Sequence, residues 1–124
     1  MARRRSKILS QRELEVMNAV WNLGRASVRQ VREELGGEKA GAYTSIATML
    51  KFLEKKSILR HRKVGRTYFY YSRHTRMEEQ LKAAHYFLHY YFEGKILLLF
   101  ELVLQIAKLS ETELEGLKTL IDAV

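Results

Sequence analysis

Apolar residues recur every three or four positions in three stretches of the first third of the chain, which is the spacing of one helical face. The recurring residues of the first stretch are Leu14, Met17 and Trp21. Ser10 and Glu13 occupy the two positions of a capping box before this stretch, and Gly24 follows it. The pattern predicts a helix over residues 11–23 whose tryptophan packs in the core.

The second stretch, "SVRQVREELGG", repeats this pattern over fewer residues. Its apolar positions are Val28, Val31 and Leu35. Ser27 is placed to cap the helix, and the double glycine at 36–37 is placed to end it. Arg29 and Arg32 lie off the apolar stripe, where a solvated surface is the first expectation and contact with phosphate the second.

The third stretch, "AYTSIATMLKFLEKKS", predicts a helix with two different faces. At 100° per residue, one sector collects Ile46, Met49, Leu50 and Leu53. The opposite sector collects Thr44, Thr48, Lys51 and Lys55. Small hydroxyls and lysines suit a helix in a DNA major groove, because threonine can contact a base edge or a thymine methyl and lysine can reach guanine or phosphate. The only acidic residue is Glu54, towards the flank.

The next segment, "LRHRKVGRTYFYYSRH", holds five Lys or Arg residues and four aromatic residues in sixteen positions. The runs "ILRHRK" and "TYFYYS" are rich in strand-forming residues, and "VGR" joins them, so we expect a hairpin with Gly65 in the turn. Alternation places Tyr68 and Tyr70 on one face and Phe69 and Tyr71 on the other. One face must cover the helices, which uses about half of the aromatic residues as packing.

Two functions fit such a segment: a platform on which single-stranded bases stack, or a wing that holds duplex DNA. Three helices followed by a basic hairpin is the order of a winged helix-turn-helix domain, in which the third helix enters the major groove and the wing lies along the phosphates. We therefore interpret the hairpin as a wing.

The last third of the chain predicts three more helices. The first has an apolar stripe of Met77, Leu81, Ala84, Leu88 and Tyr91, and Gly94 ends it. "ILLLFELVLQIAK" is apolar on several sides. The third begins with a capping box at Ser110 and Glu113, and its stripe is Leu114, Leu117, Leu120, Ile121 and Val124. About 50 residues cannot bury this surface alone, so we expect a two-fold symmetric dimer, with packing against the N-terminal domain as the alternative.

His85 and His89 are four residues apart on a predicted helix, a spacing that can hold one metal ion. Two histidines leave the coordination of a zinc-type site incomplete, so we expect their rings to pack among Tyr86, Tyr90 and Tyr91 instead. We expect no metal and no cofactor.

The distribution of charge agrees with a nucleic-acid partner for the first part of the chain only. The net charge is +8. Residues 1–73 hold 17 Lys and Arg against 6 Asp and Glu, whereas residues 74–124 hold 5 against 8. A basic N-terminal part and a slightly acidic tail indicate that the first part meets a polyanion.

Other classes of protein find little support. There is no cysteine, no phosphate-binding glycine loop and no G-x-S-x-G motif, so we expect no catalytic residue. The longest apolar run, residues 96–104, is interrupted by Glu101 and is too short to span a bilayer, and "MARRRSK" lacks the apolar run of a signal sequence. We expect a soluble, cytoplasmic protein.

Three segments, "LEVMNAVW", "YTSIATMLKFLEKKSILRHRKVGRTYFYY" and "LSETELEGLKTLI", resemble the BlaI/MecI/CopY penicillinase-repressor family across nearly the whole chain. The resemblance implies a bacterial homodimeric repressor that binds a palindromic operator. It places Thr44, Ser45 and Thr48 where the family reads bases, and Arg66 in the wing. It also implies, for some relatives, a membrane-bound sensor that triggers proteolysis of the repressor.

The chain departs from the family pattern at several positions. Phe52 stands where the family commonly has arginine, Ser57 where it commonly has glycine, and Ala47 where some members have arginine. No Asn-Phe dipeptide is present, although some relatives are cleaved at one, and the C-terminal cysteines of the copper-responsive branch are missing.

The predicted fold is mostly α with a small β-hairpin wing. Residues 1–73 form a winged-helix domain whose first nine residues are a basic flexible arm, and residues 74–124 form a helical dimerisation region. The predicted function is a sequence-specific transcriptional repressor, and the alternative is a winged-helix interaction module that does not bind DNA. The predicted DNA-binding residues are Thr44, Ser45, Thr48, Lys51, Lys55, Arg62, Lys63 and Arg66. The predicted dimerisation residues are Leu88, Tyr91, Leu114, Leu117, Leu120 and Ile121.

Overall fold

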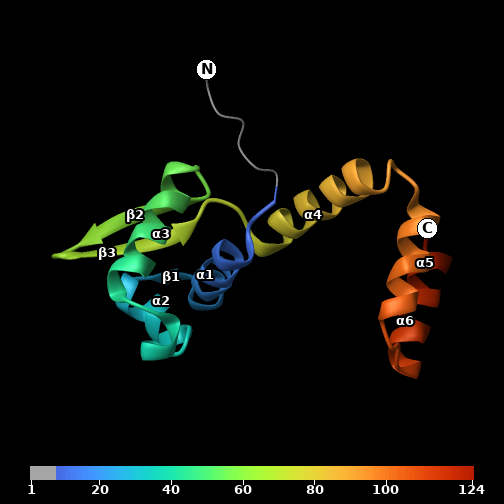
Figure 1. Cartoon of the computed structure of the whole chain (residues 1–124), viewed down its shortest axis with the longest axis horizontal. Helices are drawn as coiled ribbons and strands as arrows, with labels where there is room; N and C mark the ends of the chain where they lie inside the picture. Colours follow the sequence, from blue (N-terminus) through green and yellow to red (C-terminus); the bar gives the residue numbers. More distant parts are fainter. Residues whose placement is uncertain (1–7) are drawn as a thin grey trace, which may run out of the picture. The chain divides into compact units, whose positions relative to one another are not determined.

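A computed structural model describes residues 8–124 of the chain (Figure 1). The predicted basic arm, with Arg3, Arg4, Arg5 and Lys7, lies outside the described residues apart from positions 8 and 9. The α-helices are α1 (Gln11–Leu23), α2 (Val28–Glu34), α3 (Tyr43–Lys55), α4 (Arg76–Tyr86), α5 (Ile96–Ile106) and α6 (Glu111–Asp122). The strands are β1 (Arg25–Ala26), β2 (Leu59–Val64) and β3 (Thr67–Ser72). The short helical segments are the 3₁₀-helix η1 (Gly37–Ala40) and the π-helix η2 (Phe87–Tyr91).

The chain divides into two compact units, of which the first ends at Ala84 and the second runs from His85 to Val124. The first unit extends past residue 73 because the start of α4 packs on α1. The Arg76 guanidinium lies 5.5 Å from the centre of the Trp21 ring and donates a 2.7 Å hydrogen bond to Asn22 Oδ1. The Trp21 indole in turn donates to the carbonyl of His74.

Capping boxes begin α1 and α2 where the sequence predicts them. Ser10 accepts from the Glu13 amide while the Glu13 carboxylate accepts from the Ser10 amide, and Ser27 and Gln30 make the same pair of bonds. Each box satisfies amides that have no partner within the first turn of the helix. Gly24, with a φ of +82°, ends α1 in a conformation that an L side chain rarely adopts.

The core of the first unit lies between α1, α2, α3 and one face of the sheet. Its largest fully buried side chains are those of Val16, Met17, Val20, Val31, Ile46, Leu50, Leu53, Leu59 and Tyr70. Trp21 and Met49 are partly buried against this cluster, as predicted for the core. Leu14 was predicted to share this face but is 43% exposed, because the buried stripe of α1 passes through Val16 and Val20 instead.

The sheet has three strands in the order β1-β3-β2, all antiparallel. The hairpin of β2 and β3 was predicted with Gly65 in its turn, and the observed turn is Gly65 and Arg66. The two-residue strand β1 was not predicted. The register pairs Tyr71 with both Arg25 and Arg60, and Phe69 with Arg62, so these side chains share the face opposite Tyr70. We call that face, with Arg25, Arg60, Arg62, Phe69 and Tyr71, the outer face of the sheet.

The tail unit consists of the end of α4, η2, α5 and α6. The π-helix was not predicted: the Phe92 amide bonds the Phe87 carbonyl five residues back, which widens one turn of the helix. Gly94 follows with a φ of +77° and ends this helical run, as predicted. Ser110 and Glu113 form the predicted capping box of α6. No residue of α4, η2, α5 or α6 is buried.

None of the helices between residues 8 and 124 is long and apolar enough to cross a membrane.

Candidate nucleic-acid interface

Helix α3 separates its predicted faces cleanly. Ile46, Leu50 and Leu53 are completely buried, which fixes the rotation of the helix against the core. The predicted DNA-binding residues of the opposite face are all exposed, and they are Thr44, Ser45, Thr48, Lys51 and Lys55. This exposed surface, which we call the reading face, therefore presents three hydroxyls and two ammonium groups to solvent.

The reading face has a hollow on one side. The hollow has a volume of about 400 Å³ and is lined by Thr44, Ser45, Thr48, Met49 and Phe52. The ring of Phe52 forms the apolar wall of this hollow and is 49% exposed. Hydroxyls beside an apolar wall can contact both a base edge and the methyl group of thymine.

The single acidic residue of α3, Glu54, is held away from this hollow. Its carboxylate lies 2.6 Å from Nδ1 of His61 on β2. The His61 ring also stacks on Tyr68, with 4.5 Å between ring centroids. The contact joins α3 to the wing and engages the one side chain of α3 that would repel phosphate.

A second contact, between distant parts of the chain, holds the same C-terminal end of α3. Lys56, directly after α3, donates a 2.8 Å hydrogen bond to Glu13 of α1. Burial raises the pKa of Glu13, but hydrogen bonds from Lys56 and Ser10 and the charge of Lys56 outweigh burial, so the pKa is lowered overall. The ionised Glu13 is the one buried charged residue of the described chain.

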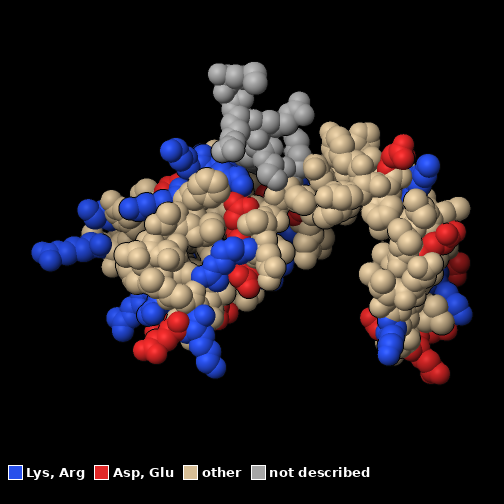
Figure 2. Space-filling view, viewed as in Figure 1, with Lys and Arg blue, Asp and Glu red and all other residues tan. Residues whose placement is uncertain are grey.

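The structure places the predicted wing residues on different sides of the hairpin. Arg62 lies on the outer face of the sheet, whereas Lys63 lies on the other face with its ammonium 5.8 Å from the centre of the Tyr68 ring. Arg66 is exposed in the turn between the strands. Figure 2 shows blue Lys and Arg side chains around this end of the hairpin. The wing thus carries positive charge on both faces and at its tip.

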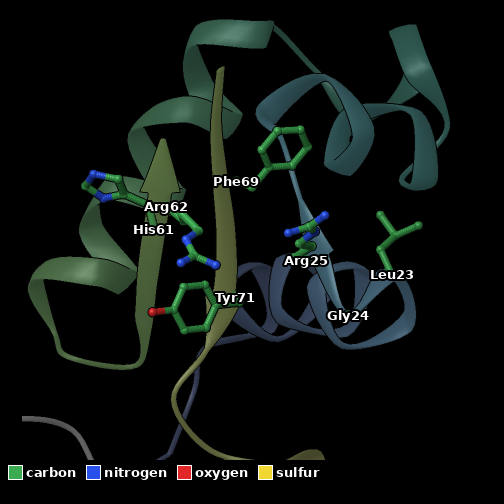
Figure 3. A pocket seen from close by; sticks show the side chains of 7 residues that line it. All are labelled: Leu23, Gly24, Arg25, His61, Arg62, Phe69 and Tyr71. Carbon is green, nitrogen blue, oxygen red and sulfur yellow. The ribbon is translucent and has the colours of Figure 1, made fainter. Parts of the chain in front are cut away.

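The outer face of the sheet holds an open hollow of about 660 Å³, which the sequence pattern does not predict. Its lining residues are Leu23, Gly24, Arg25, His61, Arg62, Phe69 and Tyr71 (Figure 3). Arg25 could not be assigned to this face from sequence because β1 was not predicted. Of the two arginines of α2, Arg29 is exposed, while Arg32 donates a 2.8 Å hydrogen bond to the Gly41 carbonyl.

The predicted dimerisation residues lie in the tail unit. Tyr91, Leu120 and Ile121 are each 66% exposed, and Leu114 is 44% exposed. Leu88 and Leu117 are half-buried. The described chain therefore leaves the apolar stripe of α6 largely in solvent.

The paired histidines do not form part of a larger cluster. Within residues 8–124, no three His, Asp or Glu side chains come together as a metal site would require. The π-helix begins between His85 and His89, so the four-residue spacing no longer corresponds to one regular α-helical turn. The ring of His89 packs edge-on against Tyr90, with 4.6 Å between centroids, which is the predicted packing for one of the two histidines.

Comparison with known proteins identifies the family. The model of the family described as "Penicillinase repressor" matches residues 9–123. The penicillinase repressor of Bacillus licheniformis is 31% identical over 88 residues, which cover 71% of this chain and 69% of that protein. The penicillinase repressor of Staphylococcus aureus is 29% identical over 119 residues, which cover 94% and 92%.

A solved structure supports the same assignment. The DNA-binding domain of the repressor BlaI matches with a TM-score of 0.51 and 31% identity, over 60% of this chain and 90% of that domain. The winged-helix fold expected from the sequence is thereby confirmed. The chain belongs to the penicillinase repressor family, whose members are DNA-binding transcriptional repressors and not enzymes.

Proposed function

We propose that this protein represses transcription as a homodimer that binds a palindromic operator. In each subunit α3 enters the major groove with its reading face towards the bases, and the wing lies along the phosphates. Thr44, Ser45 and Thr48 contact base edges in this arrangement. The positive groups on phosphates are Lys51, Lys55, Arg62, Lys63 and Arg66.

The reading face is the observation that carries this proposal. A helix that served only as a soluble surface would mix acidic and basic side chains, whereas the one acidic residue of α3 is engaged by His61. Within the described chain, neither Lys51 nor Lys55 forms an ion pair, so both ammonium groups are available to phosphate. A module that only binds proteins would more often present an acidic or apolar face on this helix.

The tail unit supplies the dimer in this proposal. The exposed stripe of Leu114, Leu120 and Ile121 is covered by the same stripe of a second copy, and residues 74–124 act as the dimerisation region. Two reading helices then bind two half-sites, which are about one helical turn or a multiple of one turn apart. Release by a sensor or protease, as in some relatives, is the proposed route of induction.

Selection of bound sequences from a pool of random duplexes tests the proposal. The selected duplexes should contain an inverted repeat with that spacing. Thr48→Ala should lower affinity for the selected duplex by about 1–3 kcal/mol and for random DNA by less, because a base contact discriminates between sequences. Lys51→Ala should weaken both alike and reduce the salt slope by about one unit, because a phosphate contact does not discriminate.

One result would contradict the proposed function, and a second would remove one residue from it. Selection that enriches no sequence would exclude specific DNA binding. Equal losses on selected and random duplex for Thr48→Ala would remove this residue from base readout while leaving the rest of the proposal in place.

A further inference from the structure

We propose that the outer face of the wing sheet binds single-stranded nucleic acid, at a site separate from the reading face of α3 that shares only Arg62 with the proposed duplex contacts. The ligand class is a short stretch of unpaired nucleotides. Its bases stack on Phe69 and Tyr71, and its phosphates lie against Arg25 and Arg62. The stacking rings and the reading face lie on different faces of the domain, since α3 packs on the opposite side of the sheet.

The geometry supplies two rings and two cations on one surface. In Figure 3, Arg62 from β2 and Arg25 from β1 lie on either side of β3, which carries both rings. The register places Phe69 across from Arg62, and Tyr71 across from Arg25. The guanidinium of Arg25 lies 5.6 Å from the centre of the Phe69 ring. Alternating rings and guanidinium groups match the alternation of bases and phosphates along a strand.

The charge of this surface fits a polyanion. The three strands contain no Asp or Glu. Among the described residues, no ion pair involves Arg25, Arg60 or Arg62. Arg60, on the same face beside Tyr71, extends the positive surface along β2. A phosphate could therefore bind these guanidinium groups without first breaking an ion pair to a carboxylate.

The size and openness of the hollow also suit a strand. A volume of about 660 Å³ exceeds what one base requires. Tyr71 is 37% exposed and Phe69 is partly buried, so each ring is anchored on the sheet while part of it remains accessible. Rings held by a sheet are the usual platform of single-strand binders, because every base has a face that can stack.

The first experiment compares strands with and without bases, because any basic protein attracts phosphates. Fluorescence anisotropy of the full chain is measured with a labelled ten-nucleotide oligothymidylate and with an abasic strand of the same length. Stacking is worth a factor of about 5–150 per base, so the strand with bases should bind at least about fivefold more tightly. Raising the salt concentration should weaken both strands and preserve this ratio. A ten-nucleotide oligouridylate distinguishes DNA from RNA as the source of the strand.

The second experiment removes the rings and keeps an apolar side chain at both positions. The double variant Phe69→Leu, Tyr71→Leu should bind oligothymidylate no better than it binds the abasic strand. Tyr68→Leu is the matched control, since Tyr68 is a comparably exposed ring of the same strand that points to the other face. It should retain the preference for bases. Binding of the selected duplex and the thermal unfolding temperature report whether each variant is folded.

Three results would overturn the inference. In the wild-type chain, equal affinity for oligothymidylate and the abasic strand would exclude stacking, whatever the variants do. An equal loss in Tyr68→Leu would exclude this face. If thymidine monophosphate competed as strongly as the decamer, the ligand would be a small molecule and not a strand. None of these results bears on the duplex site, which is tested by Thr48→Ala.

Discussion

Helices α3 and α6 are alike in sequence pattern and opposite in surroundings. Both are amphipathic helices of similar length, 13 and 12 residues. The apolar face of α3 is completely buried at Leu50 and Leu53, whereas Leu120 and Ile121 of α6 are 66% exposed. An amphipathic pattern thus predicts that a face will be covered, but it does not say by what. The first unit covers α3 within one chain, and we infer that a second chain covers α6.

The same contrast separates the two units as a whole. In the first unit, helices α1, α2 and α3 and the sheet enclose one cluster of buried residues. In the tail, α5 is apolar on several sides, and Leu97 and Ile106 are 75% and 84% exposed. Exposed apolar area of this extent usually marks an interface. The first unit therefore completes its core within one chain, and we infer that the tail is covered by a second copy.

The largest effect should come from placing a charge in the tail interface. Leu120→Asp should convert the dimer into monomers, measured by sedimentation velocity, and lower operator affinity by about 10²- to 10⁴-fold because the second half-site is no longer tethered. Thr119→Asp is the control, since it adds the same charge one residue away, off the apolar stripe. A Leu120→Asp protein that remained dimeric would exclude this stripe from the interface.

A core substitution should act on stability instead. Leu50→Ala removes a completely buried side chain and should lower the free energy of unfolding by about 2–5 kcal/mol, measured by urea denaturation. Leu120→Ala should have a smaller effect that depends on protein concentration, since its partner is a second chain. If Leu120→Ala destabilised the chain equally at all concentrations, its stripe would be packed within one subunit.

The Glu13–Lys56 pair should make the first unit sensitive to acid. Because the pKa of Glu13 is lowered in the folded state, its stabilisation is present above the ordinary carboxyl pKa and is lost as the pH falls through the folded value. Glu13→Gln should therefore cost about 1–3 kcal/mol at pH 7 and less at pH 3. Denaturation at the two pH values measures this difference. An equal cost at both would show that the charge of Glu13 does not contribute.

The smallest predicted effect concerns the backbone after α3. Ser57 has a φ of +67°, a left-handed conformation that disfavours residues with a side chain. The resemblance places glycine there in the family, and glycine adopts this conformation without strain. Ser57→Gly should raise the free energy of unfolding by about 1 kcal/mol. A loss of stability would mean that the serine side chain makes a compensating contact.

Features set by short-range chemistry could be predicted from the sequence. The bounds of α1 follow from its capping box and Gly24, and the hairpin follows from strand-forming runs around Gly65. The two faces of α3 follow from helical periodicity. In each case the determining residues are within a few positions of one another.

Features set by long-range pairing could not be predicted. Strand β1 is two residues long and exists because it pairs with β3, some 45 positions along the chain. The burial of Glu13 depends on Lys56, and Leu14 is exposed because the core formed on the neighbouring stripe. The outer face of the sheet therefore appeared only when Arg25 was placed beside Tyr71.

The π-helix η2 is a different case. It requires one hydrogen bond of five-residue span, from the Phe92 amide to the Phe87 carbonyl, in a segment of aromatic residues with regular α-helical periodicity. Nothing in "HYFLHYYF" distinguishes a π turn from an α turn, so the stripe predicted through Leu88 and Tyr91 assumed the wrong pitch.

The central claim is that the first unit binds DNA and the tail holds two copies together. Its most direct test is the spacing of the two half-sites. The affinity of the full chain is measured for the selected palindrome and for the same duplex with five base pairs inserted at its centre. Half a turn rotates one half-site to the opposite side of the duplex, so a tail-tethered dimer should lose most of its avidity, about 10²- to 10⁴-fold. Unchanged affinity for the lengthened duplex would show that each winged-helix unit binds alone, and would contradict the account.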